Sequence, residues 1–503
     1  MNPNARATLT PIAMMLAVAV LLVGGAVALD SGWTVLADPD AWLSGLQGGA
    51  ALDRVGNAAE VVAGVLAIAI TVVAIVVELA ANRYTHRITQ LFVRDTTNQL
   101  VLAFFVLTTI VCLWTSAAPL EQIADARITA TLAMGMVTAC LLILLPYFMF
   151  LFRFLAPRNV ITRIAAQALE AARRGKRDEM LGAIEELEDL SRGARQHHDR
   201  SIALASVDAL ADVLRGYVEL RPELDAPWFR IDGELARDPD FVALAPSATA
   251  ELEQQRTWLE AKILRQFLSL FDESIGEDRD LGSLIALNTQ ALAAELADRH
   301  PPIVDLAIRF FNSYLRVSIR AGDLRTAYYV LDRYRALGEE VLDRGDTESL
   351  TRIAAHLHEY GDFACDLGLG FLLEVVAFDI ASLVERAAER LPDQVDPLLD
   401  RLLSVDRVLE DDDRVECLLG VRRTQIQLAT YFLQRNDEAR ARTIATDMRG
   451  DNRRRLLQVR EQLENETREQ YWEFTDRGIN FSYLEPERRT ELARFFALLE
   501  ESA

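Results

Sequence analysis

Lysine and cysteine are both scarce in this sequence. Lys176 and Lys262 are the only lysines among 53 basic side chains, so arginine carries nearly all of the positive charge. No two of the four cysteines are spaced as a CxxC pair: Cys112, Cys140, Cys365 and Cys417. We therefore expect neither a disulfide framework nor a zinc site.

Common catalytic signatures are missing as well. The chain contains no Gly-rich phosphate-binding loop, no GxSxG and no HExxH. His356 and His358 lie close in sequence, but positions two apart point to nearly opposite sides of a helix, so they are poorly placed to share a metal ion. We predict that the protein is not an enzyme and has no catalytic, cofactor-binding or metal-binding residues.

Long apolar runs are confined to the first third of the chain. A helix needs roughly 20 apolar residues to cross the hydrocarbon core of a bilayer. Four runs meet this length when their apolar flanks are included: residues 9–29, 61–77, 100–114 and 128–152. The first run is not followed by the small-x-small site of a cleaved signal peptide. Residues 1–155 are therefore predicted to form a four-helix transmembrane domain in the lipid bilayer.

The charges beside these runs predict their orientation. The loop after the second run holds Arg83, Arg87 and Arg94, and the exit from the fourth run holds Arg153 and Arg158. The loops on the opposite side carry mainly carboxylates. Because Lys and Arg near membrane helices are retained on the cytoplasmic side, we predict a multi-pass inner (plasma) membrane protein with both termini in the cytoplasm. The first three arginines would form an interfacial basic segment.

The remainder of the chain is strongly acidic. After residue 155 there are 46 basic and 66 acidic side chains, a balance of −20. A surface of this charge repels phosphate backbones, so nucleic acid is not an expected partner.

Apolar residues recur with helical spacing through most of the acidic part. One stripe falls in residues 302–319 and a second follows the break at Ala321-Gly-Asp-Leu324. Similar helix, turn, helix patterns surround Gly175 and Asn436, and these hairpins resemble tetratricopeptide-type units. We predict an all-α protein whose cytoplasmic part is a helical solenoid or array. Its expected parts are first helices at 156–220, an irregular linker or loop at 221–249, and an acidic solenoid-like domain at 250–503.

Four polar residues in the apolar runs are candidate pore or gate residues: Glu78, Thr71, Thr108 and Thr109. A carboxylate inside a membrane is costly and often functional. Glu78 also lies at the cytoplasmic end of its run, where the simpler interpretation is a boundary carboxylate. Threonines in membrane helices commonly bond to the carbonyl one turn back, so they do not require a polar path.

The stretch around Glu78 carries a family resemblance. It consists of Val-Glu-Leu-Ala-Ala-Asn-Arg-Tyr at 77–84, followed by Arg87, Phe92, Asp95 and Gln99. Over residues 60–115 the sequence resembles the bacterial predicted-membrane-protein family called domain of unknown function 2254. The resemblance implies a membrane protein and brings no established activity.

Together these patterns favour an integral membrane protein of unknown biochemical activity that acts as a helical interaction, scaffold or sensory protein with a cytoplasmic protein partner. The alternative is an oligomeric ion channel or transporter with a regulatory cytoplasmic domain. Small residues in the apolar runs allow close helix approach, so a homo-oligomer is expected: Gly24, Gly25, Ala63, Gly64 and Gly135.

Overall fold

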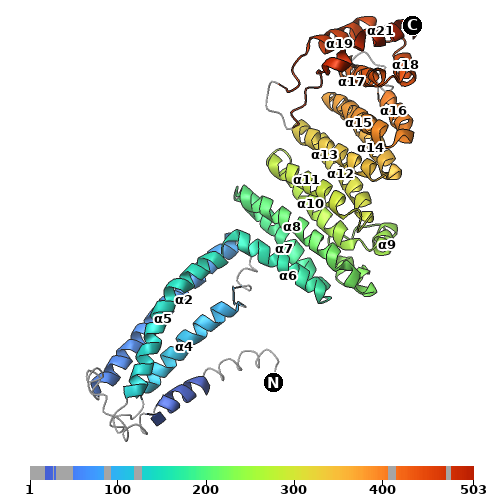
Figure 1. Ribbon diagram of the computed structural model, residues 1–503. Coiled ribbons are helices and arrows are strands. Elements are labelled where there is room, and N and C mark those ends of the chain that lie inside the picture. The colour runs from blue at the N-terminus through green and yellow to red at the C-terminus, as the bar shows by residue number, and fades with distance from the viewer. Residues whose placement is uncertain are drawn as a thin grey trace. The chain divides into compact units, whose positions relative to one another are not determined.

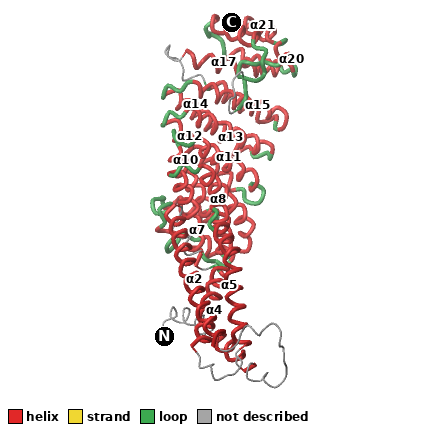
Figure 2. The backbone as a smooth tube through the Cα atoms, turned by 90° about the vertical axis from the view of Figure 1, so that its left-hand side faces the viewer, coloured by secondary structure: helices red, strands yellow, loops and turns green. Residues whose placement is uncertain are grey.

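The computed structural model describes residues 17–26, 28–29, 49–83, 92–93, 95–117, 127–405, 415–471 and 477–502. Across these residues the chain is α-helical and has no strand, as Figure 2 shows, apart from one isolated bridge between Gln470 and Ile479. The predicted all-α fold is confirmed. The chain divides into two compact units, Met1–Arg163 and Ile164–Ala503.

Three helices of the first unit are long and apolar enough to cross a membrane. They are α2 (Gly49–Arg83), α4 (Thr96–Ala117) and α5 (Arg127–Phe154), and each packs on the other two. The prediction of four spans is therefore corrected to three for the described residues. The helical part of the first apolar run is described only over Ala17–Ala26 and the two residues 28 and 29, which is too short to span a bilayer.

The burial pattern of this unit fits a bilayer. Small and medium side chains fill the centre of the bundle, among them Val111, Ala133 and Cys140. Large aliphatic side chains point outward instead, and Leu142 and Leu145 are 71% and 74% exposed. Lipid can cover such an apolar surface while the helices satisfy their own backbone groups.

The second unit is a stack of helices (Figure 1). Helix α6 begins in the first unit and ends in the second. The longer helices run in this order: α6 (Pro157–Arg173), α7 (Arg177–Gln196), α8 (Arg200–Leu220), α9 (Pro246–Gln255), α10 (Trp258–Ser274), α11 (Arg279–Leu296), α12 (Pro302–Arg320), α13 (Leu324–Asp343), α14 (Thr347–Asp366), α15 (Phe371–Arg390), α16 (Val395–Ser404), α17 (Val415–Gln434), α18 (Glu438–Asp447), α19 (Arg453–Asn465), α20 (Pro486–Arg489) and α21 (Leu492–Ser502).

The helices of this unit stack in two layers. In one layer α8 packs on α11, α11 on α13, α13 on α15 and α15 on α17. In the other, α7 packs on α10, α10 on α12, α12 on α14 and α14 on α16. Consecutive helices such as α12 and α13 join the two layers. Each hairpin therefore packs against its neighbours, and α19, α20 and α21 pack on α17 at the C-terminal end.

The predicted turns are present. Gly175 and Gly322 both have φ of +69°, and Asn436 has φ of +61°. Glycine adopts this left-handed conformation at little cost because it has no Cβ, and asparagine tolerates it better than most other residues. These residues therefore end the helices here. Asp323 then caps α13 by accepting a hydrogen bond from the backbone N–H of Thr326 at 3.1 Å.

The non-periodic segment 221–249 contains three short 3-10 helices: Arg221–Glu223, Ala226–Phe229 and Leu235–Arg237. It also contributes to the core. The indole N–H of Trp228 donates to the Tyr217 hydroxyl at 3.1 Å, and the indole N–H of Trp258 donates to the carbonyl of Trp228 at 2.9 Å. This irregular segment is therefore packed against α8 and α10.

Candidate functional site

A cavity of about 1070 Å³, which we call the terminal groove, lies in the second unit. Its walls come from the start of α11, the turn between α12 and α13, the start of α15, the middle of α17, and residues 471 and 479–482. These pieces are widely separated in sequence. The two-layer stacking brings them together, since α11, α13, α15 and α17 follow one another in a single layer.

One wall of the groove is formed by residues 477–484, which we call the C-terminal strap. Phe481 packs against Phe371, Phe378 and Tyr328, with ring centroids 6.2, 4.8 and 6.4 Å away. The side-chain amide of Gln427 in α17 donates to the carbonyls of Phe481 and Tyr483 at 3.0 and 2.8 Å. The strap is thereby attached to α13, α15 and α17.

Arg477 fixes the start of the strap. Its side chain is 1% exposed and pairs with the fully buried Asp379 of α15 at 2.6 Å. It also donates to the carbonyl of Tyr328 at 2.8 Å, while its guanidinium lies 4.4 Å from the centre of that ring. Burial raises the pKa of Asp379, and Arg477 and Arg335 oppose this rise. Asp379 thus depends on its arginine neighbours to stay charged.

A second ion pair lies in the groove itself. Glu374 of α15 and Arg423 of α17 are 2.8 Å apart, and Arg423 also donates to the Ser482 hydroxyl. Burial raises the pKa of Glu374, and Arg423 opposes this only in part. Gly420 makes room for the carboxylate, because a Cβ at that position would come within 2.4 Å of it. This pair joins two stacked helices and the strap at one point.

Apolar side chains are exposed along the groove. In the described part of the second unit seven large apolar side chains are exposed, and three of them line the groove: Leu324, Phe371 and Tyr471. Their exposed fractions are 38%, 44% and 41%. Folding alone does not require them to be exposed together, and clustered apolar exposure is typical of binding surfaces.

A smaller cavity of about 440 Å³ lies on the other side of the strap. Ile479 and Asn480 line both cavities. In the smaller one Arg488 donates to both carboxylate oxygens of Glu385, at 2.8 and 2.9 Å. This paired contact anchors α20 to α15.

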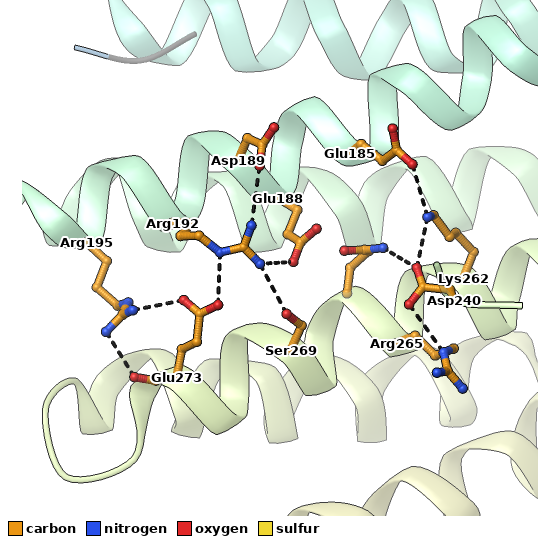
Figure 3. Close-up of polar contacts among 11 residues, drawn as sticks. Glu185, Glu188, Asp189, Arg192, Arg195, Asp240, Lys262, Arg265, Ser269 and Glu273 are labelled. Atoms are coloured by element: carbon orange, nitrogen blue, oxygen red, sulfur yellow. Dashed lines mark hydrogen bonds and ion pairs between the residues drawn. The ribbon is translucent and has the colours of Figure 1, made fainter. Parts of the chain in front are cut away.

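Elsewhere in this unit, partly buried polar contacts join α7 to α10 (Figure 3). Lys262 is 2% exposed and pairs with Asp238 at 2.7 Å, Asp240 at 2.8 Å and Glu185 at 3.3 Å. Burial acts to lower the pKa of Lys262, but its hydrogen bonds and charge interactions with Asp238 and Asp240 outweigh this, so that the pKa is raised. Lys262 therefore remains an ammonium with a structural role.

Two arginines of α7 continue this row, as Figure 3 shows. Arg192 pairs with Glu188 at 2.5 Å and with Glu273 at 2.9 Å. Arg195 pairs with the other oxygen of Glu273 at 2.8 Å and donates to the Glu273 carbonyl at 2.9 Å. None of these contacts opens onto the terminal groove, so we interpret the row as packing between α7 and α10.

The candidate pore residues lie in the membrane unit, and neither cavity described above includes them. Thr71, Thr108 and Thr109 each donate to the carbonyl four residues earlier, at 2.8, 2.8 and 2.9 Å. Thr108 is buried and accepts from the Cys140 thiol at 3.3 Å, which joins α4 to α5. Glu78 is exposed near the end of the span Gly56–Leu79.

The predicted basic segment is largely outside the described residues. Arg87 and Arg94 both lie outside them, and of Arg83 only its place at the end of α2 is described. Nearby, Asp95 caps α4 by accepting from the backbone N–H of Thr97 at 2.9 Å. The Tyr147 hydroxyl of α5 donates to the side-chain oxygen of Asn98 at 2.6 Å, a buried polar contact between two spans.

Residues 6–213 match the model of a family described as predicted membrane protein, domain of unknown function 2254. Over these residues the chain is similar to that family. The resemblance inferred from residues 60–115 is confirmed, and the match extends well beyond that stretch in both directions. A search of the curated proteins and a search of the solved structures each found no match.

The matched residues end within α8, so the terminal groove lies entirely beyond them. Sequence reasoning also missed the groove residues, because each belongs to a separate helix or turn. One signal was available in Gly478-Ile-Asn-Phe-Ser-Tyr483, a run with two aromatic residues and no helical spacing near the C-terminus. Such a run is typical of an extended segment packed onto helices.

Proposed function

We propose that this protein is a membrane-anchored scaffold whose cytoplasmic helical array binds a partner protein in the terminal groove. The proposal rests on one observation above the others: three of the seven exposed large apolar side chains of the array gather at this cavity. Concave sites that combine apolar walls with a few polar groups are the usual form of a binding site.

The membrane region would serve as the anchor. The arginines after the second and fourth apolar runs favour a multi-pass inner-membrane protein with both termini in the cytoplasm. The array would then face cytoplasmic partners close to the membrane. Stacked helix hairpins of tetratricopeptide type commonly bind partners in this way, and the two-layer stacking supports that analogy.

Site-specific photo-crosslinking in intact cells tests the proposal. A photoreactive amino acid at Phe371 should crosslink a defined partner, whereas the same amino acid at Leu457 should not. Leu457 is the matched control, since it is 48% exposed in the same array but does not line the groove. Equal crosslinking at the two positions, or none at either, would refute the proposed binding site.

The partner identified in this way is then purified and its affinity measured on the full-length protein. Truncation of a central aromatic contact costs about 2 kcal/mol or more. We expect Phe371→Ala to weaken binding at least tenfold and Leu457→Ala to leave it unchanged. An unchanged affinity in Phe371→Ala would assign the partner to another surface.

The alternative proposal is an oligomeric channel with a regulatory domain. One observation favours it: Thr71 and Glu78 are both exposed and lie seven residues apart in α2, hence on one face of that helix. If that face lined a pore between copies of the chain, liposomes holding the purified protein would conduct ions. The flux would fall in Glu78→Gln and Thr71→Val, and its absence in the unaltered protein would exclude the alternative.

A further inference from the structure

We propose that the terminal groove binds a short peptide segment that carries both a carboxylate and a large apolar side chain. This inference rests on the proposed function, since it names the class of partner for the same groove. It is carried by the charges and the exposed side chains that line the cavity.

The charge of the groove favours an anion. Its lining includes three arginines and two carboxylates: Arg279, Arg325, Arg423, Asp323 and Glu374. Both carboxylates already have partners. Asp323 accepts from the N–H groups of Thr326 and Gly276, at 3.1 and 3.3 Å, and Glu374 pairs with Arg423.

Arg279 differs from the other groove arginines in its environment. It is exposed at the first residue of α11, and among the described residues no ion pair or hydrogen bond of its side chain is recorded. The acidic part of the chain has a net charge of −20. The guanidinium of Arg279 is therefore a positive group available to an anion within a mainly negative surface. A guanidinium binds a carboxylate through two parallel N–H groups.

The apolar part of the site lines the same cavity as Arg279. Phe371 is 44% exposed, and its ring lies 5.7 Å from Tyr328 and 6.2 Å from Phe481. A side chain entering the groove would therefore meet an aromatic cluster that is already packed and rigid. Aromatic and aliphatic side chains gain most from such a contact.

One ligand segment can contact both parts because they line the same cavity. Arg279 lies at the start of α11 and Phe371 at the start of α15, and both side chains are exposed. An extended peptide rises about 3.3 Å per residue, so a segment of a few residues is long enough to carry a carboxylate and an apolar side chain into one cavity.

The charge of the surrounding array favours a peptide over nucleic acid. The cavity of about 1070 Å³ is at the upper end of the roughly 300–1,000 Å³ that is usual for ligand sites, so it has room for an extended segment. Nucleic acid would bring many phosphates against the acidic array, which repels them. A peptide segment presents one or two carboxylates at the groove alone.

Peptide selection on the full-length protein in lipid nanodiscs tests the inference. A random phage-displayed peptide library is the probe. We expect enriched peptides to carry Asp or Glu together with an aromatic or large aliphatic residue, and we expect Arg279→Glu to weaken their binding at least tenfold. Arg454→Glu is the matched control, because Arg454 is exposed in α19 and does not line the groove.

A charge-swapped peptide sharpens the test. Replacing the peptide carboxylate by Lys should abolish binding to the unaltered protein and restore it to Arg279→Glu. Groove peptides that are lost in Phe371→Ala but carry no carboxylate would overturn this inference and leave the proposed function standing. Selected peptides unaffected by Phe371→Ala would overturn both. Binding of inorganic phosphate or AMP that depends on Arg279, without peptide binding, would overturn the peptide assignment.

Discussion

Arg477 is the contact that we expect to keep the C-terminal strap docked. In Arg477→Met the fully buried Asp379 loses the partner at 2.6 Å and keeps only Arg335, 3.4 Å away. Breaking a buried ion pair by removing one member costs about 3–5 kcal/mol. Because Arg335 remains nearby, we expect a free-energy cost of about 3 kcal/mol, which is roughly a hundredfold change in the opening equilibrium of the strap.

Hydrogen exchange measured by mass spectrometry on the full-length protein reports this opening. The backbone N–H of Tyr483 donates to the Asn480 carbonyl at 3.0 Å within the strap. Its exchange should accelerate roughly a hundredfold in Arg477→Met. Arg453→Met is the control, because Arg453 is 80% exposed and its pair with Glu500 is a surface contact worth at most about 1 kcal/mol.

A second substitution tests the cause. The double variant Arg477→Met with Asp379→Leu removes both charges, and replacing a whole buried pair by apolar residues is often close to neutral. Most of the strap's protection from hydrogen exchange should therefore return. Arg335 is not left unpaired in this variant, because it still pairs with Asp332 at 2.9 Å. If Arg477→Met exchanges like the unaltered protein, or the double variant is no better than the single one, the ion pair does not hold the strap.

Three further predictions concern other contacts. Burial raises the pKa of Glu374, so on acidification Glu374 should become neutral at a higher pH than an ordinary glutamate, and binding of an acidic peptide whose carboxylate is still ionised should strengthen. Glu374→Gln should bind the peptide more tightly at neutral pH and lose this pH dependence in fluorescence anisotropy. Lys262→Met leaves Asp238 and Asp240 without their ammonium partner, so urea denaturation should show a free energy of unfolding lower by about 3–5 kcal/mol. A decrease below about 1 kcal/mol would contradict the buried-pair argument. Tyr147→Phe removes the hydrogen bond to Asn98 between two membrane helices, so unfolding in mixed micelles should show a free energy of unfolding lower by about 1 kcal/mol. An unchanged free energy of unfolding would mean that this hydrogen bond does not stabilise the membrane helices.

Much of the helical fold was predictable from local pattern. The turns at Gly175, Gly322 and Asn436 follow from residues that tolerate positive φ. The predicted apolar stripe after Gly322 is buried, whereas Phe310 and Val317 of the stripe before it are only half-buried. The number of spans was less secure. Three apolar runs form helices long enough to cross a membrane, whereas residues 9–29 are described as helix only in part.

The candidate site was not predictable in the same way. Pore candidates such as Glu78 drew attention because a charge in an apolar run is visible in a short window of sequence. The terminal groove has no such local mark, since Arg279, Phe371 and Arg423 are each ordinary residues of amphipathic helices.

The sequence by itself determined the division of this protein into apolar membrane helices and an acidic helical part, because segment length, hydrophobicity and helical period are properties of consecutive residues. Only the tertiary structure decided where a binding groove lies. Stacking α11, α13, α15 and α17 in one layer brings together side chains up to about 200 residues apart, from Arg279 to Phe481, and the strap closes them into a cavity. Such a site is set by the packing of whole helices against one another, and no short stretch of the chain contains it.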